Sequence, residues 1–179
     1  MSIAVLYGGN RPNGNTETLT KKAIQGLVVE EIYLKDYLIQ PITDKRHAEE
    51  GFPEINDDYD SIIDRILQYD ILIFSTPIYW YSMTGTMKNF VDRWSQTLKD
   101  AKYPDFKKQM SQKSAYVIAV GGDDPYMKGL PMIQQFQYIF DFIGTSFAGY
   151  IIGEGNKPGE IVQDMKALYA AEQLREKLQ

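Results

Sequence analysis

The sequence contains no cysteine and a single histidine, His47, among its 179 residues. Without cysteine the chain cannot form a disulfide, an iron–sulfur cluster or a thiolate metal site, and it has no cysteine nucleophile. His47 stands between Arg46 and Ala48 with no evident partner, so we expect it on the surface and not in a metal site or as a general base. The sequence therefore points away from thiol, metal and histidine chemistry.

Long hydrophobic runs and an excess of basic charge are also missing. The apolar stretch at the amino terminus is far shorter than a membrane span and has no basic flank of the kind found in secretion signals. A net charge of −5 gives no electrostatic footprint for nucleic acid or anionic lipid. We therefore expect a soluble, cytoplasmic protein with no nucleic-acid or membrane partner.

What the sequence does contain is an alternation of short apolar runs and amphipathic segments. Buried strands are predicted at 3–7, 28–34, 71–74, 115–120 and 146–152, the second at a sheet edge because Glu30 and Glu31 interrupt it. Amphipathic helices are predicted after each strand, and Pro158 is expected to open the last one. Its inward residues are predicted to be Val162, Met165, Leu168 and Tyr169.

This alternation predicts one domain, 1–179, with an α/β fold. A chain of this length can bury a hydrophobic core without disulfides or other cross-links. Five strands that alternate with helices, with no internal repeat, favour a flavodoxin-like three-layer sandwich with a five-stranded parallel sheet in the order 2-1-3-4-5.

Two connections are longer than a compact domain needs, residues 35–58 and 99–113. The first is expected to cover part of the protein or to contact a partner. Its acidic end, with Asp57, Asp58 and the nearby Asp60, is predicted to cap the next helix and to face solvent, since no second oxygen cluster completes a metal site.

The loop after the first strand, residues 8–16, has the composition of a phosphate site. It contains GGNRPNGNT and offers backbone N–H groups, amides, a hydroxyl and one cation at the start of a helix. It has neither the Gly-Lys-Ser/Thr of a Walker loop nor the spacing of the dinucleotide fingerprint. The alternative is an ordinary turn in which Thr16 or Asn15 caps the helix and Arg11 points into solvent.

Two further loops follow predicted strands. Residues 77–85 combine Tyr79, Trp80 and Tyr81 with hydroxyl groups, and residues 121–124 begin with two glycines that would let a flat ligand approach the backbone. In the predicted strand order these loops meet the first one at a single sheet edge. Together they fit FMN better than a nucleoside triphosphate, which needs a lysine and a metal ligand. Packing or a subunit contact is the alternative for the aromatic residues, and a tight turn is the alternative for the glycines.

The stretches GGNRPNGNTETL and STPIYWYSMTGTMKNFVDRW resemble the NADPH-dependent FMN reductase and NAD(P)H-quinone oxidoreductase group of flavodoxin-like flavoproteins, close to its iron–sulfur flavoprotein subgroup. The subgroup's cysteine cluster would fall within 35–58, where this chain has no cysteine, so cluster chemistry does not transfer. Relatives commonly have serine at the position of Gly9, so one hydroxyl contact to phosphate is missing here.

The resemblance implies an enzyme that passes hydride from NAD(P)H to bound FMN and then to a quinone, azo, nitroaromatic or flavin acceptor in a ping-pong cycle. No catalytic side chain and no metal ligand is identified. Backbone N–H groups of residues 77–82 are expected to contact the flavin edge. The residues expected to bound the substrate space are Tyr79, Trp80, Tyr81 and Tyr126. The predicted cofactor-binding residues are Gly9, Arg11, Asn13, Gly14, Asn15, Thr16, Pro77, Ile78, Tyr79, Trp80, Tyr81, Ser82, Met83, Gly121, Gly122 and Asp123.

Two rival functions are considered. A flavodoxin-type electron carrier would bind the same FMN and serve a protein partner, and a receiver-like module would need a clustered acidic pocket that this sequence lacks after its first strand. A homodimer or a dimer of dimers is expected, because the aromatic loop and the long connections would otherwise leave apolar surface exposed. The physiological acceptor and the choice between NADH and NADPH are left open.

Overall fold

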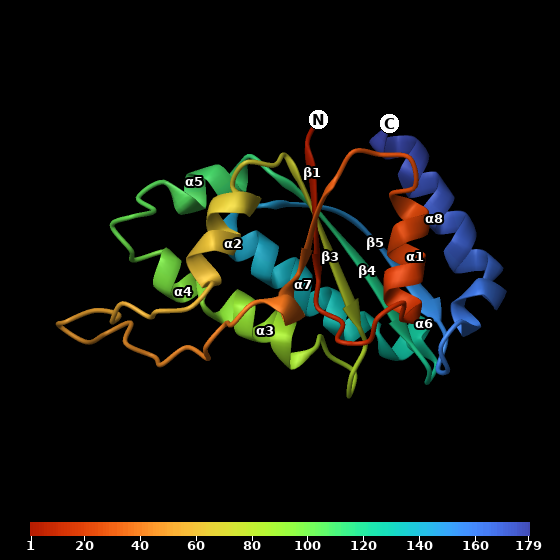
Figure 1. Cartoon of the computed structure of the whole chain (residues 1–179), viewed down its shortest axis with the longest axis horizontal. Coiled ribbons are helices and arrows are strands. Elements are labelled where there is room, and N and C mark those ends of the chain that lie inside the picture. Colours follow the sequence, from red (N-terminus) through yellow and green to blue (C-terminus); the bar gives the residue numbers. More distant parts are fainter.

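A computed structural model of the chain describes residues 1–179 and shows a parallel sheet with helices on both faces (Figure 1). The strands lie in the order β2-β1-β3-β4-β5, and every neighbouring pair is parallel. The predicted strand order and flavodoxin-like α/β architecture are confirmed. The strands are β1 (Ile3–Tyr7), β2 (Glu30–Tyr33), β3 (Ile71–Pro77), β4 (Ser114–Gly121) and β5 (Ser146–Glu154).

The helices form two layers, one on each face of the sheet (Figure 1). Helices α1 and α8 cover one face, and α2, α3, α4, α5 and α7 cover the other. The α-helices are α1 (Asn15–Ala23), α2 (Tyr59–Ile66), α3 (Gly85–Asp92), α4 (Trp94–Thr97), α5 (Phe106–Ser111), α6 (Pro125–Lys128), α7 (Leu130–Ile143) and α8 (Met165–Leu178). Two 3₁₀ turns are η1 (Leu34–Asp36) and η2 (Glu160–Gln163).

The central strand β3 explains why its sequence is apolar without alternation. Leu72 and Phe74 belong to the core under the α7 layer, whereas Ile71 and Ile73 belong to the core under α1 and α8. Successive side chains of a strand point to opposite faces, so a strand covered on both faces needs apolar residues throughout. The strand continues to Pro77, three residues beyond the predicted end, and this extension brings the next loop to the sheet edge.

The prediction for the last helix is wrong. Helix α8 begins at Met165, not at Pro158. Gly159 interrupts the chain with a positive φ of 85°, and the Asp164 side chain caps the helix by accepting the N–H of Ala167 at 3.0 Å. A helix is nucleated where such a cap is available, not at the first proline. Val162, Met165 and Tyr169 are exposed and Leu168 is half-buried; the inward residues are Ala167, Ala171, Leu174 and Leu178.

The long connection 37–58 projects from the sheet but is fixed at both of its ends (Figure 1). The guanidinium of Arg93 donates to the Gln40 carbonyl at 3.0 Å and to the Asp57 carboxylate at 2.7 Å. Both charged side chains are almost fully buried. Asp57 also accepts the N–H of Tyr59, but it does not face solvent as expected, because it neutralises a buried arginine.

The other expectations for this region have mixed outcomes. Asp58 precedes α2 but accepts the N–H of Leu38 at 2.7 Å and makes no side-chain cap, so its predicted capping role is wrong. Asp60 pairs with Lys102 at the surface. His47 is exposed, as predicted. None of the helices combines the length and the apolar character needed to cross a bilayer.

Candidate functional site

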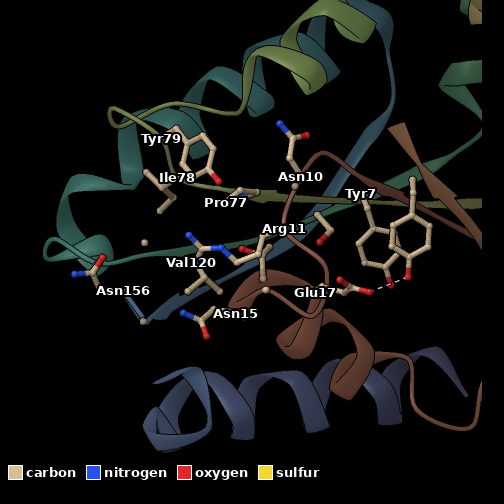
Figure 2. Close-up of a pocket in the computed structure, with 18 residues that line it drawn as sticks. Tyr7, Asn10, Arg11, Asn15, Glu17, Pro77, Ile78, Tyr79, Val120 and Asn156 are labelled. Atoms are coloured by element: carbon tan, nitrogen blue, oxygen red, sulfur yellow. Dashed lines mark hydrogen bonds between the residues drawn. The ribbon is translucent and has the colours of Figure 1, made fainter. Parts of the chain in front are cut away.

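The carboxyl ends of β1, β3, β4 and β5 surround a cavity of about 240 Å³, called here the main cavity (Figure 2). The three loops singled out from sequence do converge there. The predicted residues that line it are Gly9, Arg11, Gly14, Asn15, Thr16, Pro77, Ile78, Tyr79, Gly121 and Gly122.

The remaining predicted residues lie elsewhere. Trp80, Tyr81 and Asp123 line a second cavity of about 210 Å³ next to the main one. Asn13, Ser82 and Met83 line neither: Asn13 is an exposed turn residue, the Ser82 hydroxyl donates to Gln135, and Met83 is buried in the core. These three side chains are therefore not placed to contact a ligand of either cavity.

Several lining residues were not predicted. They are Tyr7, Asn10, Glu17, Tyr33, Ser75, Val120, Gly155 and Asn156. Gly155 and Asn156 follow β5, and the predicted position of β5 beside β4 was sufficient to place this glycine-containing turn at the same edge. Tyr7 was missed because it ends an apolar strand whose residues were all assigned to the core. Ser75 was missed because it was placed between the predicted strand, 71–74, and the predicted site loop, which was taken to begin at Pro77.

The glycine-rich loop, residues 8–16, presents unpaired backbone donors. The N–H of Asn13 bonds to Glu17, but the N–H groups of Gly9, Asn10, Arg11, Gly14, Asn15 and Thr16 make no hydrogen bond within the protein. The last two lie in the first turn of α1, where the helix dipole favours an anion. Arg11 extends from this loop into the group of lining residues and forms none of the chain's salt bridges (Figure 2).

Glu17 holds the conformation of the glycine-rich loop. One carboxylate oxygen accepts the N–H of Asn13 at 2.8 Å. The other accepts the Tyr33 hydroxyl at 3.0 Å, and Figure 2 marks a hydrogen bond of Glu17 with a dashed line. Asn13 has a positive φ of 53°, a conformation that costs more than it does for glycine, although asparagine adopts it more readily than most other residues. The bond from Glu17 compensates this cost and ties the loop to β2.

Two stacked tyrosines form the end wall beside Glu17. The rings of Tyr7 and Tyr33 are nearly parallel, with centroids 4.4 Å apart. The Tyr7 hydroxyl donates to Glu31 at 2.8 Å, and Lys21 pairs with the same carboxylate. Burial, and then the hydrogen bond to Glu31, raises the pKa of Tyr7 far above its ordinary value, so this wall is uncharged at Tyr7 and rigid.

The side chain of Asn15 is bonded within the protein through both its nitrogen and its oxygen. It donates to the Lys157 carbonyl at 2.9 Å and accepts the N–H of Gly159 at 2.9 Å. It therefore does not cap α1, as the alternative proposed, and only one of its two amide N–H groups is left without a partner in the chain. Its effect is to dock the turn after β5 against α1, which brings Asn156 to the cavity.

The turn from Tyr79 to Ser82, called here the aromatic hairpin, is tight and strained. Tyr79 and Ser82 exchange backbone hydrogen bonds of 2.9 and 3.0 Å, and both central residues, Trp80 and Tyr81, have positive φ values of 48° and 63°. Together with the bond from Ile78 to the Val120 carbonyl, these contacts occupy the N–H groups of Ile78, Tyr79 and Ser82. The N–H groups of these three residues are therefore not free for a flavin edge, and the expectation that backbone N–H groups of 77–82 contact the flavin stays a prediction for the rest of the loop.

The expected role of Tyr126 is also wrong. Tyr126 lines neither cavity, and its hydroxyl donates to the Asp164 carboxylate at 2.7 Å. Apart from the end wall of Tyr7 and Tyr33, the aromatic residues that border the cavities are Tyr79, Trp80 and Tyr81, which are 48, 95 and 46% exposed. The mouth of the site is therefore formed by the aromatic hairpin.

The open parallel sheet in this strand order defines a flavodoxin-like protein. In open α/β sheets of this kind ligands bind outside the carboxyl ends of the strands, where the free N–H groups, the glycines and the rings of this chain lie. A family model described as NADPH-dependent FMN reductase matches residues 1–136. The chain therefore belongs to the NADPH-dependent FMN reductase family. It is an oxidoreductase of the flavoprotein class, with FMN as cofactor and NAD(P)H as co-substrate.

Individual relatives agree with this assignment. The chain is 63% identical to YwqN of Bacillus subtilis, whose name describes an NAD(P)H-dependent FMN-containing oxidoreductase, over 97% of this chain and 96% of that protein. A solved structure described as a Trp repressor binding protein from Bacillus subtilis is 56% identical, covers 97% of both chains and has a TM-score of 0.83. An FMN-dependent NADH-azoreductase from Bacillus anthracis, solved in complex with FMN, shares the fold at a TM-score of 0.66 and 14% identity over 99% of this chain and 98% of that chain.

Proposed function

We propose that this chain binds FMN in the main cavity and uses NAD(P)H to reduce a small acceptor, either a quinone, an azo compound, a nitroaromatic or a free flavin, in a ping-pong cycle. The proposal rests on one observation, that the two ends of the cavity differ in chemistry. Free N–H groups and Arg11 gather at one end, and bare glycine backbone lies at the other. FMN matches these two ends, because it has a phosphate at one end and a flat ring at the other.

The phosphate end fits an anion without further rearrangement. The N–H groups of Gly14, Asn15 and Thr16 and the guanidinium of Arg11 are available, since none has a partner in the chain. Charge-assisted hydrogen bonds of this kind are about twice as strong as neutral ones. Because Gly9 has no hydroxyl, the backbone N–H groups and Arg11 would make the contacts to the phosphate.

The ring end fits a flat group because its wall is backbone. A Cβ at Gly122 would lie 2.8 Å from the Cβ of Asn156, and a Cβ at Gly121 would lie 3.2 Å from the Cβ of Ile78. A side chain at Gly122 would clash with Asn156, and one at Gly121 would fit only if Ile78 shifted. The free N–H of Gly122 remains as a donor toward the cavity. When bound, FMN supplies the hydride chemistry, and the chain supplies position and hydrogen bonds.

A ping-pong cycle is the part of the proposal that follows from the family resemblance. In that cycle nicotinamide and acceptor reach the flavin in turn, and one leaves before the other enters. The lining of the main cavity supplies no obvious acid or base for the chemistry, because its one carboxylate, Glu17, is bonded to Asn13 and Tyr33.

The self-association expected from sequence is retained as part of the proposal. The outer side of α7 exposes Leu130, Tyr138 and Phe142, next to the exposed Trp80 and Met127. Exposed apolar residues at this density are typical of subunit contacts. A homodimer or dimer of dimers in the cytoplasm is expected, and light scattering during gel filtration tests the mass.

Anaerobic reduction tests the catalytic proposal. NADPH or NADH added to the FMN-loaded protein should bleach the yellow flavin, and steady-state plots at several acceptor concentrations should give parallel lines. A flavin that stays oxidised with both nucleotides would instead support the electron-carrier alternative. Gly122→Val tests the placement, because its side chain would collide with Asn156 and should prevent retention of FMN.

A further inference from the structure

The second cavity shares Ile78, Gly121 and Gly122 with the main cavity. Its remaining walls come from the aromatic hairpin and from the segment around α6, through Trp80, Tyr81, Asp123, Pro125, Lys128 and Gly129. Because the two cavities share these residues, a molecule in the second cavity lies directly beside the part of the main cavity where we propose the flavin ring. The second cavity is thus placed to hold a reaction partner.

One wall of the second cavity is aromatic, and its backbone conformation is energetically unfavourable. Trp80 is 95% exposed, and Trp80 and Tyr81 both have the positive φ that disfavours large side chains. Each such residue costs about 1–2 kcal/mol. The Tyr79–Ser82 backbone bonds, the Ser82–Gln135 bond of 3.0 Å and the Tyr81–Asp123 bond of 2.7 Å oppose this cost. Strain that is held by so many contacts is typical of ligand-binding segments.

The opposite wall carries a cation with unused donors. The Lys128 ammonium donates to one oxygen of Asp123 at 2.7 Å, and the Tyr81 hydroxyl donates to the other oxygen at 2.7 Å. Both carboxylate oxygens of Asp123 therefore have a donor, whereas the ammonium uses one of its three N–H groups. The hydrogen bond to Asp123 raises the pKa of Lys128, so the ammonium stays charged throughout the neutral range.

We propose that the second cavity binds an anionic group attached to a flat molecule, with Lys128 contacting the anion and Trp80 and Tyr81 contacting the flat part. This inference rests on the proposed function, because it places the molecule beside the flavin. The anionic group has two sources with the same chemistry. It is either a sulfonate or carboxylate on the acceptor ring, or the 2′-phosphate that distinguishes NADPH from NADH.

The test measures charge preference in each half-reaction of the FMN-loaded enzyme. Anaerobic stopped-flow gives the rate of flavin reduction by NADPH and by NADH, and the rate of reoxidation by naphthoquinone and by naphthoquinone sulfonate. Two preferences are compared: NADPH over NADH in flavin reduction, and naphthoquinone sulfonate over naphthoquinone in reoxidation. Lys128→Gln should lower one of these two rate ratios by about tenfold, the usual effect of one charge-assisted hydrogen bond. Lys128→Arg should keep the preference, because it keeps the charge.

Lys108→Gln is the matched control. Lys108 is an exposed lysine on α5, which precedes β4 and lies at the amino ends of the strands, away from the cavities. Its substitution removes the same charge and should leave both preferences as in the wild type. A general effect of net charge would appear equally in Lys108→Gln and Lys128→Gln.

A binding measurement without turnover completes the test. Of the two tryptophans, Trp80 is exposed and Trp94 is buried, so quenching of indole fluorescence by naphthoquinone sulfonate reports contact at Trp80. Lys128→Gln should weaken this quenching more for the sulfonate than for the parent quinone if the acceptor is the source. If the 2′-phosphate is the source, NADPH binding should weaken instead.

A loss of preference in either half-reaction supports the proposal and identifies the source. Unchanged preferences in both half-reactions of Lys128→Gln overturn it. If the wild-type flavin is reduced by neither nucleotide, the proposed function itself fails, and that outcome is separate from a normally reduced enzyme in which Lys128 has no effect.

Discussion

The two loops that flank the main cavity are held in opposite ways. In the glycine-rich loop a side chain, Glu17, fixes the backbone and leaves a row of N–H groups free. In the aromatic hairpin the backbone bonds to itself, and the side chains of Trp80 and Tyr81 project outward. The first loop therefore presents mainly backbone to its ligand, with Arg11 as the added side chain, and the second presents side chains.

This difference indicates a division of work. Backbone donors are the same whatever the residue, so the glycine-rich loop suits the constant part of the site, the cofactor phosphate. Side chains can be exchanged without changing the fold, so the aromatic hairpin suits the selection of substrates. Substitutions in the first loop should change cofactor affinity, and those in the second should change stability and preference. The predictions below test this contrast.

Arg11→Ala should have the largest effect, on FMN affinity. Arg11 is the one cation of the main cavity, and the loss of a charge-assisted contact to phosphate should weaken FMN by about thirtyfold, or about 2 kcal/mol. Quenching of flavin fluorescence on titration measures it. Riboflavin, which has no phosphate, should bind the variant and the wild type alike, and Arg46→Ala removes a guanidinium outside the site as a control. An equal loss for riboflavin would contradict a phosphate contact.

Glu17→Ala should weaken FMN by about tenfold, because Asn13 loses the acceptor that compensates its strained φ. Glu17→Gln keeps an oxygen for that N–H and removes a negative charge near the phosphate, so its affinity should equal or exceed that of the wild type. The same titration separates the two variants. If Glu17→Gln weakens FMN binding as much as Glu17→Ala, the negative charge of Glu17 matters and its hydrogen bond to the Asn13 N–H does not.

Trp80→Gly should stabilise the FMN-free protein by about 1 kcal/mol, because glycine takes a positive φ without strain while an exposed indole contributes little to the core. Thermal unfolding measures the change. Trp80→Ala is the control, since it removes the ring but retains a Cβ at the same φ, and it should give no such gain. Equal gains in both variants would show that the ring, and not the backbone, is unfavourable.

The fold was predictable because its signals are local. The apolar run at 71–74 and the glycine-rich loop after β1 each lie within a few residues, and parallel sheets impose one position on the loops that follow their strands. The convergence of three loops therefore followed from sequence. The wrong start of α8 also has a local cause, since Gly159 and the Asp164 cap outweighed the proline signal.

The details of the site were not predictable because they depend on distant contacts. The Asn15 side chain bonds to Lys157 and Gly159, more than 140 positions away in sequence, and nothing near Asn15 indicates that its amide is occupied. The donors of Ile78 and Tyr79 were likewise assigned to a ligand, although β4 and the aromatic hairpin itself use them. A pattern shows which groups a loop contains, but only the fold shows which of them are free.

The smallest expected effect concerns the side-chain contact that anchors the aromatic hairpin. The hydrogen bonds from Lys128 and then from Tyr81 hold the pKa of Asp123 below its usual range. A folded pKa below the unfolded value, about 3.9, means that the contact stabilises the fold fully above that pH and is lost only as the pH falls through the lower folded pKa. The hairpin should therefore stay anchored throughout neutral and mildly acidic conditions.

Carboxyl NMR titration of Asp123 measures this pKa directly. Lys128→Gln should raise it most, and Tyr81→Phe should raise it less, because the lysine contributes the larger share of the shift. The free energy of unfolding should change little in either variant, since Asp123 is exposed and solvent screens the interaction. If neither substitution moves the titration, the Asp123 contact does not anchor the aromatic hairpin, which is then held by its backbone bonds and by the Ser82–Gln135 bond.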